Sequence, residues 1–214
     1  WHSDIEHIDM REGEWLILAR NNYLLNQVES QCRLEGFFYK RNNRKGVTDS
    51  LLEAILNWES LRKGRGVIAS EVRKIYRYMS SNKGVAKSFK TLKNIFDDEI
   101  LTLKDLLASY GLLTTAIWHE AFDKISDKER QYLIACLRAG EKLTKEPRIN
   151  ISTIHGAKGS EADNVVVITD IGQKSWIQMQ KEPDDEIRVF YVALTRVKKN
   201  LHIIQPITSR YFSL

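Results

Sequence analysis

The strongest constraint on the fold is an unbroken run of β-branched apolar residues, Val165, Val166, Val167 and Ile168. Because successive side chains of a strand point to opposite faces, a strand of this composition has to be covered on both faces. Such strands are typical of parallel sheets that carry helices on both sides. A second apolar run, WLILA at residues 15–19, has the same character near the start of the chain.

The order of the predicted elements indicates an α/β sheet domain built from both ends of the chain. The opening reads strand, helix, strand, which favours a parallel sheet. The same kind of pattern resumes after Pro147. The predicted elements are strands at 15–19, 37–40, 149–154, 165–169 and 201–204, and helices at about 20–36 and 184–199.

Between these two parts lies a block of about a hundred residues with helical spacing of its apolar side chains and almost no strand pattern. The simplest organisation is therefore a sheet domain with an inserted helical subdomain. We predict that residues 1–47 and 148–214 form the sheet domain and that residues 48–147 form the insert.

The composition is that of a soluble globular protein, with 43% hydrophobic and 29% charged residues. The formal net charge of +5 favours an anionic partner, for which nucleic acid is the commonest explanation. No apolar stretch approaches the length of a membrane span, and Cys32 and Cys136 have no partner at metal-ligand spacing. These features predict a cytoplasmic protein with buried free thiols, no membrane partner and no metal-ligand cluster of its own.

A polar stretch, HGAKGSE at residues 155–161, stands directly before the most apolar strand. Ligands of open parallel sheets bind beyond the carboxyl ends of the strands, where this stretch is expected to lie. His155 and Lys158 offer donors to phosphate, and Glu161 can accept from a sugar hydroxyl. An equal alternative is a solvated loop whose glycines only turn the chain.

Three arginines raise a similar choice between a surface role and a catalytic one. Arg196 follows a helix with an apolar face, Arg20 follows the strand WLILA, and Arg188 lies on the same helix as Arg196. Such arginines commonly extend along the surface into solvent. The alternative is an arginine finger, which stabilises the transition state of phosphoryl transfer.

Three segments resemble motifs of the UvrD/Rep-type superfamily 1 DNA helicases. INISTIHGAKGSEADNVVVI at residues 149–168 resembles motif V, and DDEIRVFYVALTRVKKNLHII at 184–204 is similar to motif VI. WLILARNNYLLNQVESQCRLEGFFYKR at 15–41 resembles the motif IV region. The resemblance implies a RecA-like parallel-sheet domain of the P-loop NTPase type, the second of two in a motor, with an inserted helical subdomain.

The same resemblance implies a nucleotide site in the cleft between two RecA-like domains. Arg20 and Arg196 are expected to contact the γ-phosphate of ATP, with Mg²⁺ held mainly by the other domain. Gly159 and Glu161 are expected to border the sugar, and Arg188 is expected on the nucleotide side of the motif VI helix. Thr153, His155 and Lys158 are expected to face single-stranded DNA or to relay its presence to the ATP site.

The chain lacks the residues of the first RecA-like domain. No G-x-x-x-x-G-K-[ST] phosphate loop occurs in it, so this segment alone is expected to hydrolyse little or no ATP. The resemblance therefore implies an ATP-dependent DNA helicase only as part of a longer protein, bacterial or phage-encoded, acting on single-stranded DNA and duplex junctions. The alternative is a nucleic-acid-binding or interaction module with the helicase shape and no ATPase role.

The predicted insert is strongly basic over part of its length. Between Arg62 and Lys93 there are ten lysines or arginines and one acid, Glu71. One interpretation is contact with the phosphates of duplex DNA, which would depend strongly on salt. The other is a solvated helical face with Tyr76 and Phe89 in a small core.

Overall fold

A computed structural model describes residues 1–93 and 95–214 and shows two compact units. The first unit joins residues 1–46 with residues 135–214, so it contains both ends of the chain. The second unit holds residues 47–134. Residues 135–147 group with the first unit.

The first unit is built on a six-stranded sheet with the strand order β3-β2-β6-β1-β7-β8. All neighbouring strands run parallel except β2 and β3, which form an antiparallel hairpin. The predicted α/β class with a mostly parallel sheet is confirmed. The strands are β1 (Trp15–Ala19), β2 (Tyr39–Arg41), β3 (Arg44–Lys45), β6 (Ile149–Thr153), β7 (Ala162–Ile168) and β8 (Val197–Ile204).

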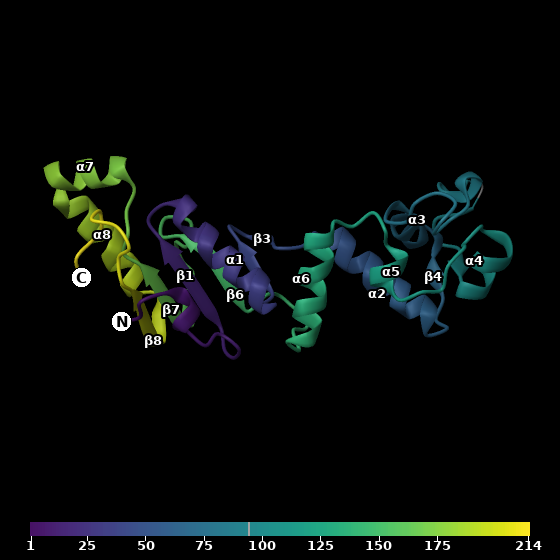
Figure 1. Ribbon diagram of the computed structural model, residues 1–214, viewed down its shortest axis with the longest axis horizontal. Helices are drawn as coiled ribbons and strands as arrows, with labels where there is room; N and C mark the ends of the chain where they lie inside the picture. Colours follow the sequence, from purple (N-terminus) through teal and green to yellow (C-terminus); the bar gives the residue numbers. More distant parts are fainter. Residues whose placement is uncertain (94) are drawn as a thin grey trace. The chain divides into compact units, whose positions relative to one another are not determined.

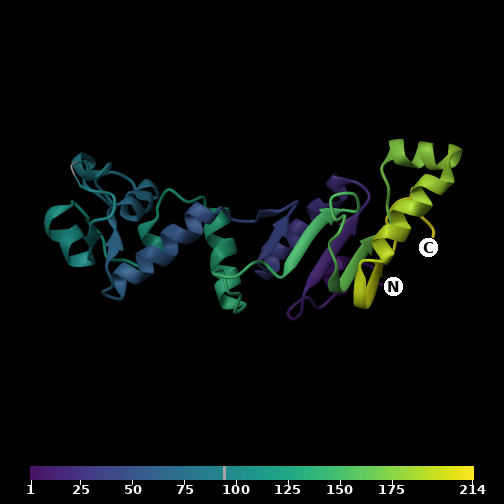
Figure 2. The same cartoon turned by 180° about the vertical axis from the view of Figure 1, so that it is seen from behind.

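Helices and an irregular segment cover the two faces of this sheet. In Figure 1 helix α1 lies in front of the strands, and in Figure 2, seen from behind, the segment after β6 lies in front of them. That opposite face also carries α8, because Phe190 and Ala193 share a buried cluster with Leu16 and Leu18 of β1. The helices of this unit are η1 (Ile5–His7), η2 (Asn22–Leu24), α1 (Leu25–Glu35), α7 (Gln173–Lys181) and α8 (Pro183–Leu194).

Burial in this unit follows the predicted patterns. All five residues of β1 are buried, as are Val165 to Ile168 of β7. Gly36 ends α1 in the left-handed conformation, with φ of 73°, which is the usual glycine C-cap. Cys32 and Cys136 are fully buried, which confirms the predicted burial of both thiols. Burial raises the pKa of the Cys32 thiol to about 12, so this thiol stays protonated at neutral pH.

The helix predicted over residues 184–199 is shorter than expected. Helix α8 ends at Leu194, and the chain enters β8 at Val197. Val197 pairs with Ala162 of β7, so parallel strand pairing holds these residues extended. The local sequence TRVKK is compatible with a helix, and the β7 partner that overrides this preference is remote in the sequence.

The second unit is mainly helical and has its own core. Helix α2 packs against α3 and α5, and Trp58, Tyr76 and Phe122 are each fully buried. A two-stranded antiparallel ribbon of β4 and β5 was not predicted, because its strands are only two residues long. The elements are α2 (Asp49–Arg62), β4 (Val67–Ile68), α3 (Ala69–Arg77), η3 (Lys87–Phe89), β5 (Ile100–Leu101), α4 (Leu103–Ser109) and α5 (Trp118–Ala121), and α6 (Asp127–Arg138) continues into the first unit.

The basic stretch of the second unit is partly neutralised. Lys74 contacts Glu71 at 2.7 Å, Arg62 contacts Glu59 at 2.7 Å, and Arg73 pairs with Asp97. Among the described residues, no ion pair is formed by five other cations of this stretch, Lys63, Arg65, Arg77, Lys87 and Lys93. Across residues 1–93 and 95–214, no helix has both the length and the apolar character needed to cross a bilayer.

Candidate nucleotide and nucleic-acid site

The polar stretch forms the connection between β6 and β7, which we call the crossover segment (residues 154–161). Its first N–H, of Ile154, donates to the carbonyl of Ala19 at the carboxyl end of β1, at 3.0 Å. Just after its end, the N–H of Ala162 donates to the carbonyl of Arg196, which precedes β8, at 3.2 Å. Because β1, β7 and β8 are parallel, the segment runs across the face of the sheet from the carboxyl ends of the strands to their amino ends. The expectation that the whole stretch lies at the carboxyl edge is therefore wrong for its second half.

The crossover segment is held on the sheet by two buried side chains and by tight turns. Ile154 and Ala157 are 2% and 1% exposed and belong to the cluster that includes Leu16 and Leu18. The N–H of Gly156 donates to Thr153 Oγ1 at 3.1 Å, so this threonine shapes the first turn. Gly159 has φ of +81°, a conformation in which other residues are strained. The polar side chains between these anchors consequently project outward.

A hollow of about 310 Å³ lies between the crossover segment and α8. Four of its lining side chains are basic, no carboxylate lines it, and the remaining lining residues are apolar. Such a surface suits a ligand with several negative charges, such as a polyphosphate. The lining residues are Ile154, His155, Lys158, Arg188, Val189, Val192 and Arg196.

The two arginines of the hollow are held to different degrees. Arg196 is partly buried, and its Nε donates to the carbonyl of Val192 at 3.0 Å. Its Nη2 lies 3.4 Å from Thr195 Oγ1, so the guanidinium is directed along the last turn of α8. The side chain of Arg188 is 77% exposed and approaches Asp185 only to 3.5 Å. Arg196 is thus the more ordered of the two cations.

Gly159 and Glu161 lie near the same edge of the sheet as Arg196 but do not line the hollow. The carboxylate of Glu161 is 3.8 Å from Lys198 Nζ, and both side chains are about half exposed. This distance is too long for a hydrogen bond, so the Glu161 oxygens are accessible as acceptors. Thr153 lies at the other edge, at the end of β6, in register with Ala19.

Arg20 is engaged inside the protein. Its Nε donates to Glu186 Oε2 at 2.8 Å and its Nη2 donates to Glu186 Oε1 at 2.8 Å. The Glu186 side chain is 4% exposed and that of Arg20 is 23% exposed. This pair joins the end of β1 to the first turn of α8.

The structure does not bring Arg20 and Arg196 together. Arg20 follows Ala19, which is in register with Ile168 at the end of β7, whereas Arg196 precedes Val197, which pairs with Ala162 at its start. The seven residues of β7 correspond to about 20 Å at roughly 3.3 Å per residue. In this structure the Arg20 side chain is engaged by Glu186 and does not approach Arg196.

Glu186 is the residue that sequence reasoning missed. It stands in an acidic run at a helix start, which is ordinarily explained by the helix dipole. Its spacing in the sequence nevertheless indicated a buried position. Glu186, Phe190 and Ala193 lie on one helical stripe, and the structure buries all three. A carboxylate on an apolar stripe predicts a buried cationic partner.

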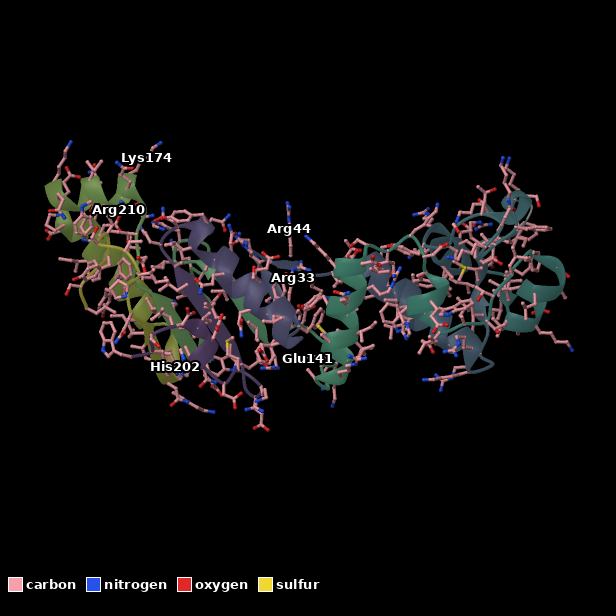
Figure 3. The ribbon with its side chains drawn as sticks, viewed as in Figure 1. Arg33, Arg44, Glu141, Lys174, His202 and Arg210 are labelled. Carbon is pink, nitrogen blue, oxygen red and sulfur yellow. The ribbon has the colours of Figure 1, made fainter. Side chains whose placement is uncertain are left out.

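Another hollow lies between α1 and the β2–β3 hairpin and measures about 490 Å³. Glu29 binds two of its cations, with 2.6 Å to Arg41 and 3.2 Å to Arg33. Arg44 extends away from the ribbon (Figure 3). Within the described part of the chain, no group of three or more His, Cys, Asp or Glu side chains is placed to hold a metal ion.

Two comparisons with known proteins bear on the segment that holds the hollow. Residues 134–206 match the family model of the UvrD-like helicase C-terminal domain. A stretch of 71 residues is 42% identical to a Mycoplasma pneumoniae protein described as a probable DNA helicase II homolog. The alignment covers 29% of this chain and 10% of that protein, so the chain spans only a small part of its relative. Residues 134–206 are thus similar to the C-terminal domain of UvrD-like helicases, and they hold the end of the mostly parallel sheet with its strands β6, β7 and β8.

Proposed function

We propose that this chain is the second RecA-like domain of an ATP-dependent DNA helicase or translocase. The observation that carries the proposal is the hollow between the crossover segment and α8, with four basic side chains and no carboxylate. It lies within the segment that matches the helicase family. A first RecA-like domain of the same polypeptide would supply the phosphate loop and the other wall of the ATP site.

The residues present fit an ATP phosphate at this hollow. Arg196 is anchored through Nε, which leaves N–H groups of its fork to donate to phosphate oxygens. ATP bound with Mg²⁺ supplies a γ-phosphoryl group whose transfer to water releases the free energy for movement. The charge of Arg196 would stabilise that transfer, with Arg188 as a second, more mobile cation. Glu161, near Gly159, would accept from the sugar hydroxyls.

The carboxyl edge of the sheet is the side proposed for single-stranded DNA. Thr153 lies at that edge, and His155 and Lys158 follow it on the crossover segment. His155 and Lys158 are exposed, so both can donate to DNA phosphates. They also line the hollow that contains Arg196. The crossover segment would therefore couple DNA binding at His155 and Lys158 to the nucleotide site at Arg196.

The second unit is proposed to contact the duplex at a junction. Five of its cations form no ion pair among the described residues, so their charge is available to DNA phosphates. Tyr76 is fully buried and its hydroxyl donates to the carbonyl of Tyr110 at 2.9 Å, which excludes base stacking on this ring. The proposal for this unit therefore rests on phosphate contact by its cations and not on Tyr76.

The test of this function is Arg196→Ala in the complete motor protein. We expect ATP turnover to fall by about 10³-fold, the effect of removing an arginine finger. Affinity for single-stranded DNA should stay nearly unchanged, because Arg196 is held on the last turn of α8 and is not among the residues proposed to contact DNA. DNA-stimulated phosphate release and fluorescence anisotropy measure the two quantities. Lys181→Ala, an exposed cation at the end of α7, is the matched control.

Lys158→Ala tests the DNA side of the same proposal. Loss of one phosphate contact should weaken binding of single-stranded DNA and reduce the salt dependence of log Kd by about 0.7. If Arg196→Ala leaves ATP turnover unchanged, Arg196 is not an arginine finger. DNA binding by a complete protein that hydrolyses no ATP would favour the interaction module instead.

A further inference from the structure

The end of β1 is tied to the amino end of α8 by a buried, two-point ion pair. Nε and Nη2 of Arg20 each donate at 2.8 Å to a different oxygen of Glu186. This fork-to-carboxylate geometry fixes orientation as well as distance. With Glu186 at 4% exposure, the pair is shielded from the solvent that weakens surface ion pairs.

The same end of β1 holds two further segments of the site. The carbonyl of Ala19 accepts from the N–H of Ile154, which begins the crossover segment, at 3.0 Å. Asn21 Oδ1 accepts from the N–H of Gly172, the residue before α7, at 2.6 Å. Three consecutive residues, 19 to 21, thus bind the crossover segment, α8 and α7.

The remaining contacts of α8 with the sheet leave its position less defined. Phe190 and Ala193 pack in an apolar cluster, and apolar contact is non-directional. The Arg20–Glu186 ion pair, in contrast, fixes the direction of the first turn of α8. From that turn α8 continues without a break to Leu194. A displacement of its first turn therefore carries Arg188, and it also moves the carbonyl of Val192 that holds Nε of Arg196 at 3.0 Å.

We propose that Arg20 and Glu186 are positioning residues, which fix α8 on the end of β1 and so set the place of Arg188 and Arg196. Arg20 then acts through Glu186 and touches no nucleotide. The link to ATP turnover rests on the proposed function, whereas the effect on α8 does not.

The first experiment uses this chain with Arg20→Met, Glu186→Leu and the double variant. Arg20→Met leaves the Glu186 carboxylate buried without a partner, so the double variant should be more stable to urea than this single variant. Amide exchange of residues 183–194 should still be about tenfold faster than wild type in the double variant, because an apolar pair does not fix the helix. Exchange of α1, residues 25–35, should be unchanged.

The second experiment measures ATP turnover of the same variants in the complete motor. Both single variants and the double variant should lose turnover by about the same factor, roughly tenfold, because they break one shared interaction. The KM for ATP should stay within about twofold, since neither residue binds nucleotide. Arg11→Met, which removes an ion pair between two largely exposed side chains, is the control for loss of an arginine.

Two results would overturn the proposal. One is wild-type exchange of α8 in the double variant. The other is lost turnover in Arg20→Met with normal turnover in Glu186→Leu, which is the pattern of a direct phosphate contact. If the complete protein hydrolyses no ATP, the proposed function fails, while the exchange experiment still decides whether the pair positions α8.

Discussion

His202 of β8 lies in a small aromatic cluster (Figure 3). Its ring centroid is 5.1 Å from that of His2 and 5.2 Å from that of Trp15, and its Nδ1 lies 3.0 Å from His2 Nε2. Burial, and then the charge of His2, lower the pKa of His202. The folded protein therefore holds this histidine neutral to a lower pH than the unfolded chain does.

This shift gives a prediction for acid stability. As the pH falls below the unfolded value of about 6.5, the unfolded chain takes up the proton first, so the free energy of unfolding decreases. The variant His202→Gln should lose the contribution of His202 to this decrease, so its free energy of unfolding should fall less than that of the wild type between pH 7.5 and 5.5. Urea unfolding at several pH values measures it. A slope in His202→Gln equal to that of the wild type over this pH range would contradict the prediction.

At the scale of single residues, the motifs predicted where basic side chains lie, but they did not predict all the contacts that these side chains make. His155, Lys158, Arg188 and Arg196 all line one hollow, as residues of two neighbouring motifs. Arg20 was predicted from its place after a strand, and a strand end alone does not reveal the partner across the fold. Its partner Glu186 is 166 residues away, so no local pattern links the two.

At the scale of elements, one aromatic contact contributes strongly to the packing of α8. Phe190 is fully buried, and its ring stacks on that of Phe212 with centroids 4.3 Å apart and planes 5° apart. The next residue, Tyr191, is 67% exposed. Substitutions at Phe190 therefore test the packing of the helix, and substitutions at Tyr191 test the effect of removing an exposed aromatic ring.

Phe190→Ala should reduce the free energy of unfolding by about 3–5 kcal/mol, the usual cost of a large aromatic cavity. Tyr191→Ala should change it by no more than about 0.5 kcal/mol, because the ring is mostly in solvent. Urea denaturation followed by circular dichroism measures both. Equal losses in the two variants would show that α8 does not pack through Phe190.

The elements were predictable to different degrees for physical reasons. The strand predicted at residues 15–19 is observed with those bounds, because its five residues are apolar and buried on both faces. The end of α8 was missed, since pairing with β7 and not local propensity makes Val197 extended. The crossover segment has no periodic pattern, so only the strand register reveals that it spans the sheet.

At the scale of the whole molecule, each unit has a core of its own. Trp58 in the second unit is fully buried, donates to the carbonyl of Ala116 at 3.1 Å and contacts the ring of Phe122. The core of the first unit is the cluster around β1, β7 and α8. The two units can therefore lose stability separately.

Trp58→Ala should speed amide exchange throughout α2 and α3 by opening the core of the second unit. Exchange of β6 and β7 should stay at the wild-type rate, because those strands belong to the other core. Hydrogen exchange followed by mass spectrometry resolves the two sets of peptides. A uniform acceleration over both units would indicate a single cooperative fold.

The place of β6 in the sheet has a consequence for the order of folding. It lies between β1 and β2, yet it follows them in the chain only after the whole second unit. During synthesis β1 and β2 are therefore made before the strand that pairs with both of them. Pairing of β6 closes a long loop that contains the second unit, which costs chain entropy. We expect the second unit, which is one continuous segment of the chain, to fold first and to shorten the loop that β6 has to close.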